Sequence, residues 1–225
     1  MNTATIKLYL AFGDPKRLRT GEISNWSGKA VAAPRTDLDE LLGREELKKP
    51  GVYILVGTDS DKGTSACYVG EAEILKERLR QHRDKDFWVH AIVVVSKDEN
   101  LTKSHIRYLE GRLISDARDA GRFEVVNLQA SGARLSESDR EEMEVFPDKV
   151  RQLLPVLGSD ILTPRPRADD SVPGPTSDLV CEIKGLKAYG RRTADGFIIF
   201  AGSQAVRELR PSADTPMKPA FCAGP

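Results

Sequence analysis

The fold is decided by residues 51–70, which read GVYILVGTDSDKGTSACYVG. Two runs rich in β-branched and aromatic residues, GVYILV and ACYV, enclose a polar stretch that contains a glycine. This pattern is typical of a β-hairpin. Because side chains alternate between the two faces of a strand, Tyr53 and Tyr68 can project from the same face if the register allows. Two ordinary half-buried strand tyrosines would show the same pattern.

The elements after the hairpin complete a small domain. We expect a charged helix over residues 73–84, a third strand over 88–95 and a closing strand over 123–128. A second helix, from about Thr102 to Ala120, ends at Gly121, because glycine readily adopts the left-handed conformation that caps a helix. The fold class is therefore α+β, with helices flanking a three-stranded antiparallel sheet.

Further elements flank this domain on both sides. Upstream, alternating apolar residues predict a strand near residues 4–12, and Lys29 to Ala33 form a weaker strand pattern. Downstream, Ser136 begins an amphipathic helix that contains Pro147. We expect strands at residues 179–183 and 197–200, joined as a hairpin.

These patterns divide the chain into five parts. They are an N-terminal β/α extension at residues 1–48, a central domain at 49–130, an amphipathic helix at 131–157, a Pro-rich linker at 158–178, and a small, truncated-looking C-terminal β-rich segment with an irregular tail at 179–225.

The composition excludes several classes of protein. The 225 residues include 34 basic and 34 acidic side chains, so a globally cationic nucleic-acid coat is excluded and any phosphate-binding surface must be a local patch. No apolar run approaches the roughly 18 to 20 residues of a membrane span, and the first residues lack a signal-peptide pattern. Three cysteines without CxxC spacing argue against a disulfide framework. We therefore expect a soluble cytoplasmic protein that does not bind membranes.

Glu110 lies within the apolar stripe of the second predicted helix. The apolar neighbours at helical spacing are Ile106, Leu113, Ile114 and Ala117. Burying an unpaired carboxylate costs several kcal/mol, so Glu110 needs a partner. A structural arginine, such as Arg78 or Arg112, and a divalent cation both satisfy this requirement, and the periodicity leaves the two open.

Arg78 and His82 are four residues apart and share one face of the first predicted helix. With Lys76, Arg80 and Arg83 they form the densest basic stretch that also contains an imidazole. Because acidic residues interleave, the charge run by itself favours a solvated charged face.

Together these positions resemble the motifs of the GIY-YIG nuclease family. They are Gly51-Val52-Tyr53, Tyr68-Val69-Gly70, Arg78, His82, Glu110 and Asn127. The arginine follows the second tyrosine by ten residues and the histidine by fourteen. The resemblance covers about residues 49–130, and residues 179–205 resemble a small C-terminal domain of unknown function often attached to one bacterial subgroup of the family.

The resemblance implies a DNA endonuclease that hydrolyses phosphodiester bonds with Mg²⁺ (or Mn²⁺). Glu110 would hold the metal and Arg78 would orient the phosphate. Tyr68, rather than Tyr53, would be the general base, with Tyr53 positioning the attacking water. A free tyrosine costs roughly 4 kcal/mol to deprotonate at pH 7, so nearby cations must supply much of that energy.

The remaining motif positions have supporting roles in this interpretation. His82 would hydrogen-bond a tyrosine or the phosphate and would titrate near neutrality, and Asn127 would position groups at the edge of the site. The predicted substrate contacts are Gly70, Lys76, Arg80 and Arg83. One metal in one small domain cleaves one strand, so a double-strand break would need a homodimer or a second event.

Glu71 departs from the pattern of DNA-repair relatives, which often carry a lysine at this position. An acid here raises the pKa of a neighbouring tyrosine unless it pairs outward or contributes to the metal site. The alternative function is a nucleic-acid-binding or partner-binding module on the same fold without turnover.

Overall fold

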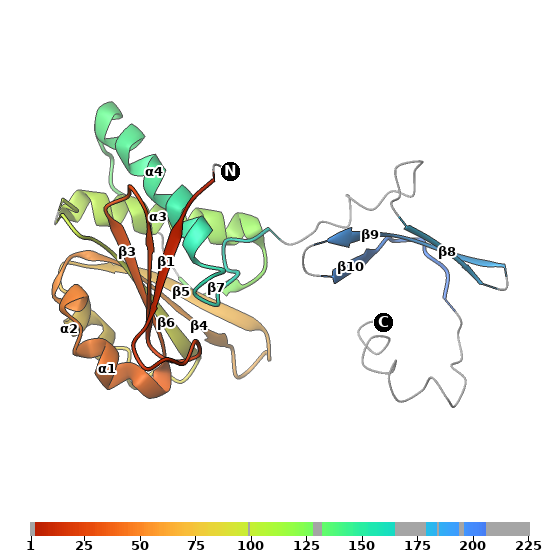
Figure 1. Ribbon diagram of the computed structural model, residues 1–225, viewed down its shortest axis with the longest axis horizontal. Helices are drawn as coiled ribbons and strands as arrows, with labels where there is room; N and C mark the ends of the chain where they lie inside the picture. The colour runs from red at the N-terminus through yellow and green to blue at the C-terminus, as the bar shows by residue number, and fades with distance from the viewer. Residues whose placement is uncertain are drawn as a thin grey trace. The chain divides into compact units, whose positions relative to one another are not determined.

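The structure is a computed structural model that describes residues 3–98, 100–127, 132–164, 179–183, 185–193 and 196–205. The chain divides into two compact units, Met1–Arg165 and Pro166–Pro225. The first contains a mixed seven-stranded sheet with helices, and the second contains a separate three-stranded antiparallel sheet (Figure 1). The predicted α+β class is confirmed at this level.

The large sheet has the strand order β1-β2-β3-β6-β4-β5-β7. Its strands are β1 (Ile6–Leu10), β2 (Arg19–Ile23), β3 (Gly28–Pro34), β4 (Gly51–Thr58), β5 (Ser65–Ala72), β6 (Trp88–Ser96) and β7 (Glu124–Val125). All neighbours are antiparallel except β5 and β7. The two strands of the predicted hairpin and the strand predicted at residues 88–95 are therefore adjacent, as β6-β4-β5. The predicted closing strand is the short β7, which pairs parallel to β5. The N-terminal extension continues the same sheet, because β3 pairs with β6.

Helices cover both faces of this sheet, with α3 and α4 on one face and α1 and α2 on the other (Figure 1). The helical elements are η1 (Arg35–Asp37), α1 (Leu38–Leu42), η2 (Glu45–Lys48), α2 (Leu75–Arg80), α3 (Lys103–Ala120) and α4 (Glu137–Leu153). The central strand β4 reads as a nearly continuous apolar run because both of its faces are buried. Val52 and Ile54 pack toward α3, and Tyr53 and Leu55 pack toward α2.

Capping and ion pairs fix α3 and α4. The Thr102 side chain accepts a hydrogen bond from the His105 amide at the start of α3, and Gly121 adopts φ 64° at its end, as predicted. The buried Asp116 carboxylate accepts hydrogen bonds from Arg112 on its own helix and Arg151 on α4. The predicted helix that begins at Ser136 is thereby held on α3.

Three expectations for the first unit are corrected. Strand β2 is additional, because Arg-Thr-Gly-Glu-Ile has no apolar alternation that would predict it. Helix α2 ends at Arg80, and His82 lies in the turns that follow. The linker predicted from residue 158 begins too early, because Ile161 and Leu162 are buried in the core. Their apolar side chains outweigh the surrounding prolines.

The second unit contains one strand more than predicted. Its strands are β8 (Leu179–Ile183), β9 (Leu186–Thr193) and β10 (Gly196–Ile199). The two predicted strands each pair with β9 and not with one another, so the predicted hairpin between them is wrong. Residues 165–178 of the linker and 206–225 of the tail lie outside the described residues. Among the described residues, no helix has the length and apolarity needed to span a membrane.

Candidate active site at the end of strand β5

Three aromatic rings gather on the α2 side of the sheet. The ring centroids of Tyr53 and Tyr68 are 6.0 Å apart, and the His82 ring lies 5.4 Å from the first and 5.2 Å from the second. Both tyrosines pack in the same core cluster, so the predicted shared face is confirmed. The register that pairs Tyr53 with Gly70 produces this arrangement.

Tyr53 is fully buried, and its hydroxyl group is the centre of a hydrogen-bond network. The hydroxyl lies 2.9 Å from His82 Nε2 and accepts a hydrogen bond from Arg78 Nε at 3.2 Å. Burial, and then the neighbouring Tyr68, raise the pKa of Tyr53 above its ordinary value. Tyr53 is therefore a neutral phenol at physiological pH, which suits a positioning role better than that of a base.

Tyr68 is the accessible phenol of the pair. Its side chain is half-buried, and the Lys85 ammonium group lies 5.5 Å from the ring centroid. Arg78 also interacts with Tyr68. Of the two phenols, Tyr68 is the one that solvent can reach, and its role as the general base stays a prediction.

Hydrogen bonds to backbone carbonyl groups fix the turn that contains His82. Trp88 Nε1 donates to the His82 carbonyl at 2.9 Å, and the Arg35 guanidinium donates to the carbonyls of Arg83 at 2.7 Å and Lys85 at 2.6 Å. Sequence reasoning missed Arg35, because no local signal connects the extension to this turn.

The expected titration of His82 near neutrality is wrong. Burial, assisted by the charges of Lys85 and Arg78, lowers its pKa to about 4. The imidazole is therefore neutral at pH 7 and acts as a hydrogen-bond partner of Tyr53.

The glycines of the motif are explained by close packing. A Cβ on Gly70 would lie 2.3 Å from the Tyr53 hydroxyl oxygen, and a Cβ on Gly51 would lie 2.3 Å from the Val94 carbonyl oxygen. Any larger residue would displace a neighbour. Gly70 is buried beneath Tyr53, so packing accounts for this residue, and its predicted substrate contact stays a prediction.

Glu110 is 8% exposed, and no described residue donates a hydrogen bond to its Oε2 atom. Burial first, and the charge of Glu71 second, raise its pKa to about 7, while Arg107 and Arg78 oppose the shift. Of the two arginines considered from the sequence, Arg112 hydrogen-bonds Glu144 and Asp116 instead.

Arg78, the other arginine considered, hydrogen-bonds Tyr53 and Gln81. Glu110 is thus not held by a structural arginine in the described part of the chain, and an unpartnered carboxylate oxygen fits a cation ligand.

Asn127 extends the pairing of β5 with its side chain. Its Oδ1 accepts a hydrogen bond from the Val69 amide at 3.0 Å, and its Nδ2 donates to the Val69 carbonyl at 2.6 Å. Strand β7 pairs with β5 at Ala66 and Cys67, so the asparagine takes the place of the next strand residue. Asn127 is therefore a positioning residue that supports β5 at Val69, between Tyr68 and Glu71.

Arg78 joins the aromatic rings to the carboxyl group. It hydrogen-bonds Tyr53, its charge lowers the pKa of Glu110, and it lines a polar hollow of about 410 Å³. The other lining residues are Glu71, Ala72, Glu73, Ile74, Glu77, Gln81 and Lys103.

The predicted basic substrate contacts differ in their surroundings. Arg80 is exposed, Lys76 is half-buried, and Arg83 pairs with Asp39 on α1. Arg80 and Arg83 are both exposed, so two of the three basic side chains are open to solvent.

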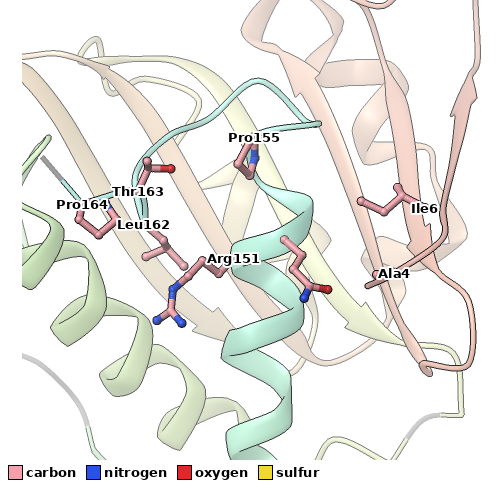
Figure 2. A pocket seen from close by; sticks show the side chains of 8 residues that line it. Ala4, Ile6, Arg151, Pro155, Leu162, Thr163 and Pro164 are labelled. Atoms are coloured by element: carbon pink, nitrogen blue, oxygen red, sulfur yellow. The ribbon is translucent and has the colours of Figure 1, made fainter. Parts of the chain in front are cut away.

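A larger and more apolar hollow of about 440 Å³ lies elsewhere in the first unit (Figure 2). It is lined by residues from the N-terminal strand, the end of α4 and the loop that follows, including Ile6, Arg151 and Leu162. None of the predicted site residues lies there. Of the predicted site residues, Arg78 lines the smaller polar hollow.

Few possible metal ligands surround Glu110 in the described part of the chain. No cluster of three or more His, Cys, Asp or Glu side chains suited to a metal occurs in the described part of the chain. Mg²⁺ does not need such a cluster, because it keeps several waters and binds one or two carboxylates together with substrate phosphate. Glu110 fits this mode of binding.

No protein-family model, curated protein or solved structure matches the chain.

Gly70→Ala tests the packing of the site. The added Cβ meets the Tyr53 ring and hydroxyl, so we expect the free energy of unfolding to fall by about 2 kcal/mol or more. Urea denaturation followed by tryptophan fluorescence measures the change. Gly132→Ala is the control, because its Cβ meets no atom within 4 Å. Equal midpoints for the two variants would contradict the packing role.

Glu110→Gln tests the raised pKa. The folded state binds the Glu110 proton more tightly than the unfolded state does, so its stabilising contribution is present below about pH 4.5 and is lost as the pH rises through 7. Glutamine does not titrate. In EDTA, the variant should gain up to about 3 kcal/mol over the wild type between pH 5 and pH 8. A difference that is constant with pH would contradict the assignment, since His82 and the other groups are common to both proteins.

Proposed function

We propose that the chain is a Mg²⁺-dependent DNA endonuclease with a GIY-YIG fold. One observation carries the proposal: Arg78 donates a hydrogen bond to the Tyr53 hydroxyl while its charge reaches the buried, unpartnered carboxyl group of Glu110. The Arg78 guanidinium group therefore interacts both with the phenol cluster and with the proposed metal-binding carboxyl group, beside a polar hollow.

The arrangement of the sheet supports this fold. Strands β6, β4 and β5 are antiparallel neighbours, with α2 on one face and α3 on the other. The motif tyrosines lie on β4 and β5, the arginine lies on α2, and the glutamate lies on α3. This is the order of elements that the resemblance implies.

Each residue has a defined task in hydrolysis. Glu110 would hold the Mg²⁺ ion, which supplies positive charge to the leaving oxygen. Arg78 pairs with the phosphate and orients it for attack. Tyr68 would act as the general base in its deprotonated form, taking a proton from the attacking water while the water oxygen bonds to phosphorus. The leaving oxygen departs and takes a proton from solvent.

Tyr53 and His82 keep this arrangement in place. The neutral His82 ring and the neutral Tyr53 hydroxyl are hydrogen-bonded, and Tyr53 accepts from Arg78. The network fixes the orientation of the guanidinium group before substrate binds, and such preorganisation lowers the cost of reaching the transition state.

DNA binding needs a local basic surface, because the net charge of the chain is zero. Arg80 and Lys85 are exposed near the site, and Lys76 lies half-buried beside them. These side chains would contact the phosphate backbone. Cleavage of both strands would use a homodimer or two successive events.

Supercoiled plasmid tests the proposal. The full chain with Mg²⁺ should nick or linearise the plasmid, EDTA should abolish cleavage, and Glu110→Gln should reduce it by about a hundredfold or more, because the metal ligand is lost. Glu141→Gln is the matched control, since Glu141 is an exposed carboxylate on α4. Agarose gels with time points measure the rates.

Two outcomes would reject the nuclease. Equal cleavage by wild type and Glu110→Gln would assign the activity to another site. DNA binding without cleavage of any nucleic acid would favour the alternative, a binding module without turnover.

Arg78→Ala separates catalysis from structure. We expect turnover to fall by about a hundredfold or more because the phosphate loses its charged partner, while the variant still binds Mn²⁺ and stays folded because His82 remains a hydrogen-bond partner of Tyr53. Arg140→Ala, on the exposed side of α4, is the control. An unfolded Arg78→Ala protein would show instead that Arg78 is a structural partner of Tyr53.

A further inference from the structure

Two carboxyl groups, those of Glu71 and Glu110, lie on the α3 side of the sheet and interact through their charges. Glu71 shares a face of β5 with Cys67 and Val69, which pack against α3. Glu110 lies on α3 within the apolar stripe. The two groups interact electrostatically, because the charge of Glu71 raises the pKa of Glu110.

Both groups present a buried oxygen without a hydrogen-bond donor. The Oε2 atoms of Glu71 and Glu110 are inaccessible to solvent and accept no hydrogen bond from the described residues. The Glu71 side chain is 17% exposed and Glu110 is 8% exposed. Two desolvated carboxylates side by side are unfavourable unless a proton or a cation lies between them.

Lys103 forms a long ion pair with Glu71, but the basic side chains nearby leave both Oε2 atoms without a hydrogen bond. Lys103 Nζ is 3.8 Å from Glu71 Oε2, beyond hydrogen-bond distance, and lies closer to Glu73, at 3.0 Å. Arg78 and Arg107 reach Glu110 by charge alone, because neither is hydrogen-bonded to its Oε2 atom. Basic side chains therefore lie near both carboxyl groups, but none donates a hydrogen bond to either Oε2 atom.

We infer that Glu71 is a second carboxylate ligand of the divalent cation that Glu110 holds. The inference rests on the proposed function and adds a residue to its metal site. Two carboxylates match the charge of Mg²⁺ or Mn²⁺, and this ion accepts one or two carboxylates while it keeps several waters. Glu71, the residue after Gly70, then binds the metal. DNA-repair relatives often carry at this position a lysine that could lower the pKa of the tyrosine.

A two-carboxylate site has a consequence for the free protein. A single glutamate binds Mg²⁺ weakly and relies on the substrate phosphate for further ligands. With Glu71 added, the ion binds before the nucleic acid does. The full chain without DNA should therefore bind Mn²⁺ at one site.

Isothermal titration of the full chain with Mn²⁺ tests the inference. We expect one site in the wild type and an affinity at least about tenfold weaker in Glu71→Gln, as in Glu110→Gln. Glu73→Gln is the matched control, because it removes the same charge from the same hollow and the same lysine while its side chain is 63% exposed. Its affinity should stay within about twofold of the wild type.

Glu71→Asp separates ligation from long-range attraction. Aspartate keeps the charge and withdraws the carboxylate by one methylene, so direct ligation predicts weaker Mn²⁺ binding and long-range attraction predicts wild-type affinity. Unfolding midpoints in EDTA establish that each variant is folded.

Three results would overturn the inference. They are wild-type affinity in Glu71→Gln, wild-type affinity in Glu71→Asp, and a free wild-type chain that binds no Mn²⁺. Plasmid cleavage by the wild type alongside any of these would leave the proposed nuclease intact. Two-carboxylate binding without cleavage would instead reject the nuclease and keep the metal site.

Discussion

The hydrogen bonds at the Tyr53 hydroxyl connect the core of this protein to its surface chemistry. The ring belongs to the central strand and is fully buried, while the oxygen meets His82 and Arg78. A buried hydroxyl without partners costs about 1–3 kcal/mol, so the partners are needed for stability as well as for geometry. The same contacts that stabilise the fold therefore fix the direction of the guanidinium group.

Much of this arrangement could be predicted from the sequence. The hairpin, the third strand and the helix that ends at Gly121 all follow from local patterns, because apolar periodicity and glycine caps act over a few residues. Strand β2 and strand β9 were missed, since neither has apolar alternation. Their pairing depends on neighbouring strands that are distant or weakly patterned in the sequence.

The candidate site was predictable in its members but not in their environments. The sequence places Glu110 on an apolar helix face, yet its raised pKa depends on Glu71, which lies on a different element. His82 has an ordinary spacing, and only its burial beside Tyr53 makes it neutral. The pKa values of both groups depend on burial and on charges from other helices and strands. The spacing of residues in the sequence does not predict these.

The first strands of the chain also protect the sheet. Strand β3 lies along β6, a strand with consecutive buried valines, and η1 carries the arginine that binds the carbonyls after α2. A shortened protein starting at residue 49 would leave β6 with a bare row of amides and carbonyls, which readily recruits strands from other molecules. The opening segment thus pairs the edge of β6 that the central domain would leave open, and a minimal version of the domain would need a substitute for it.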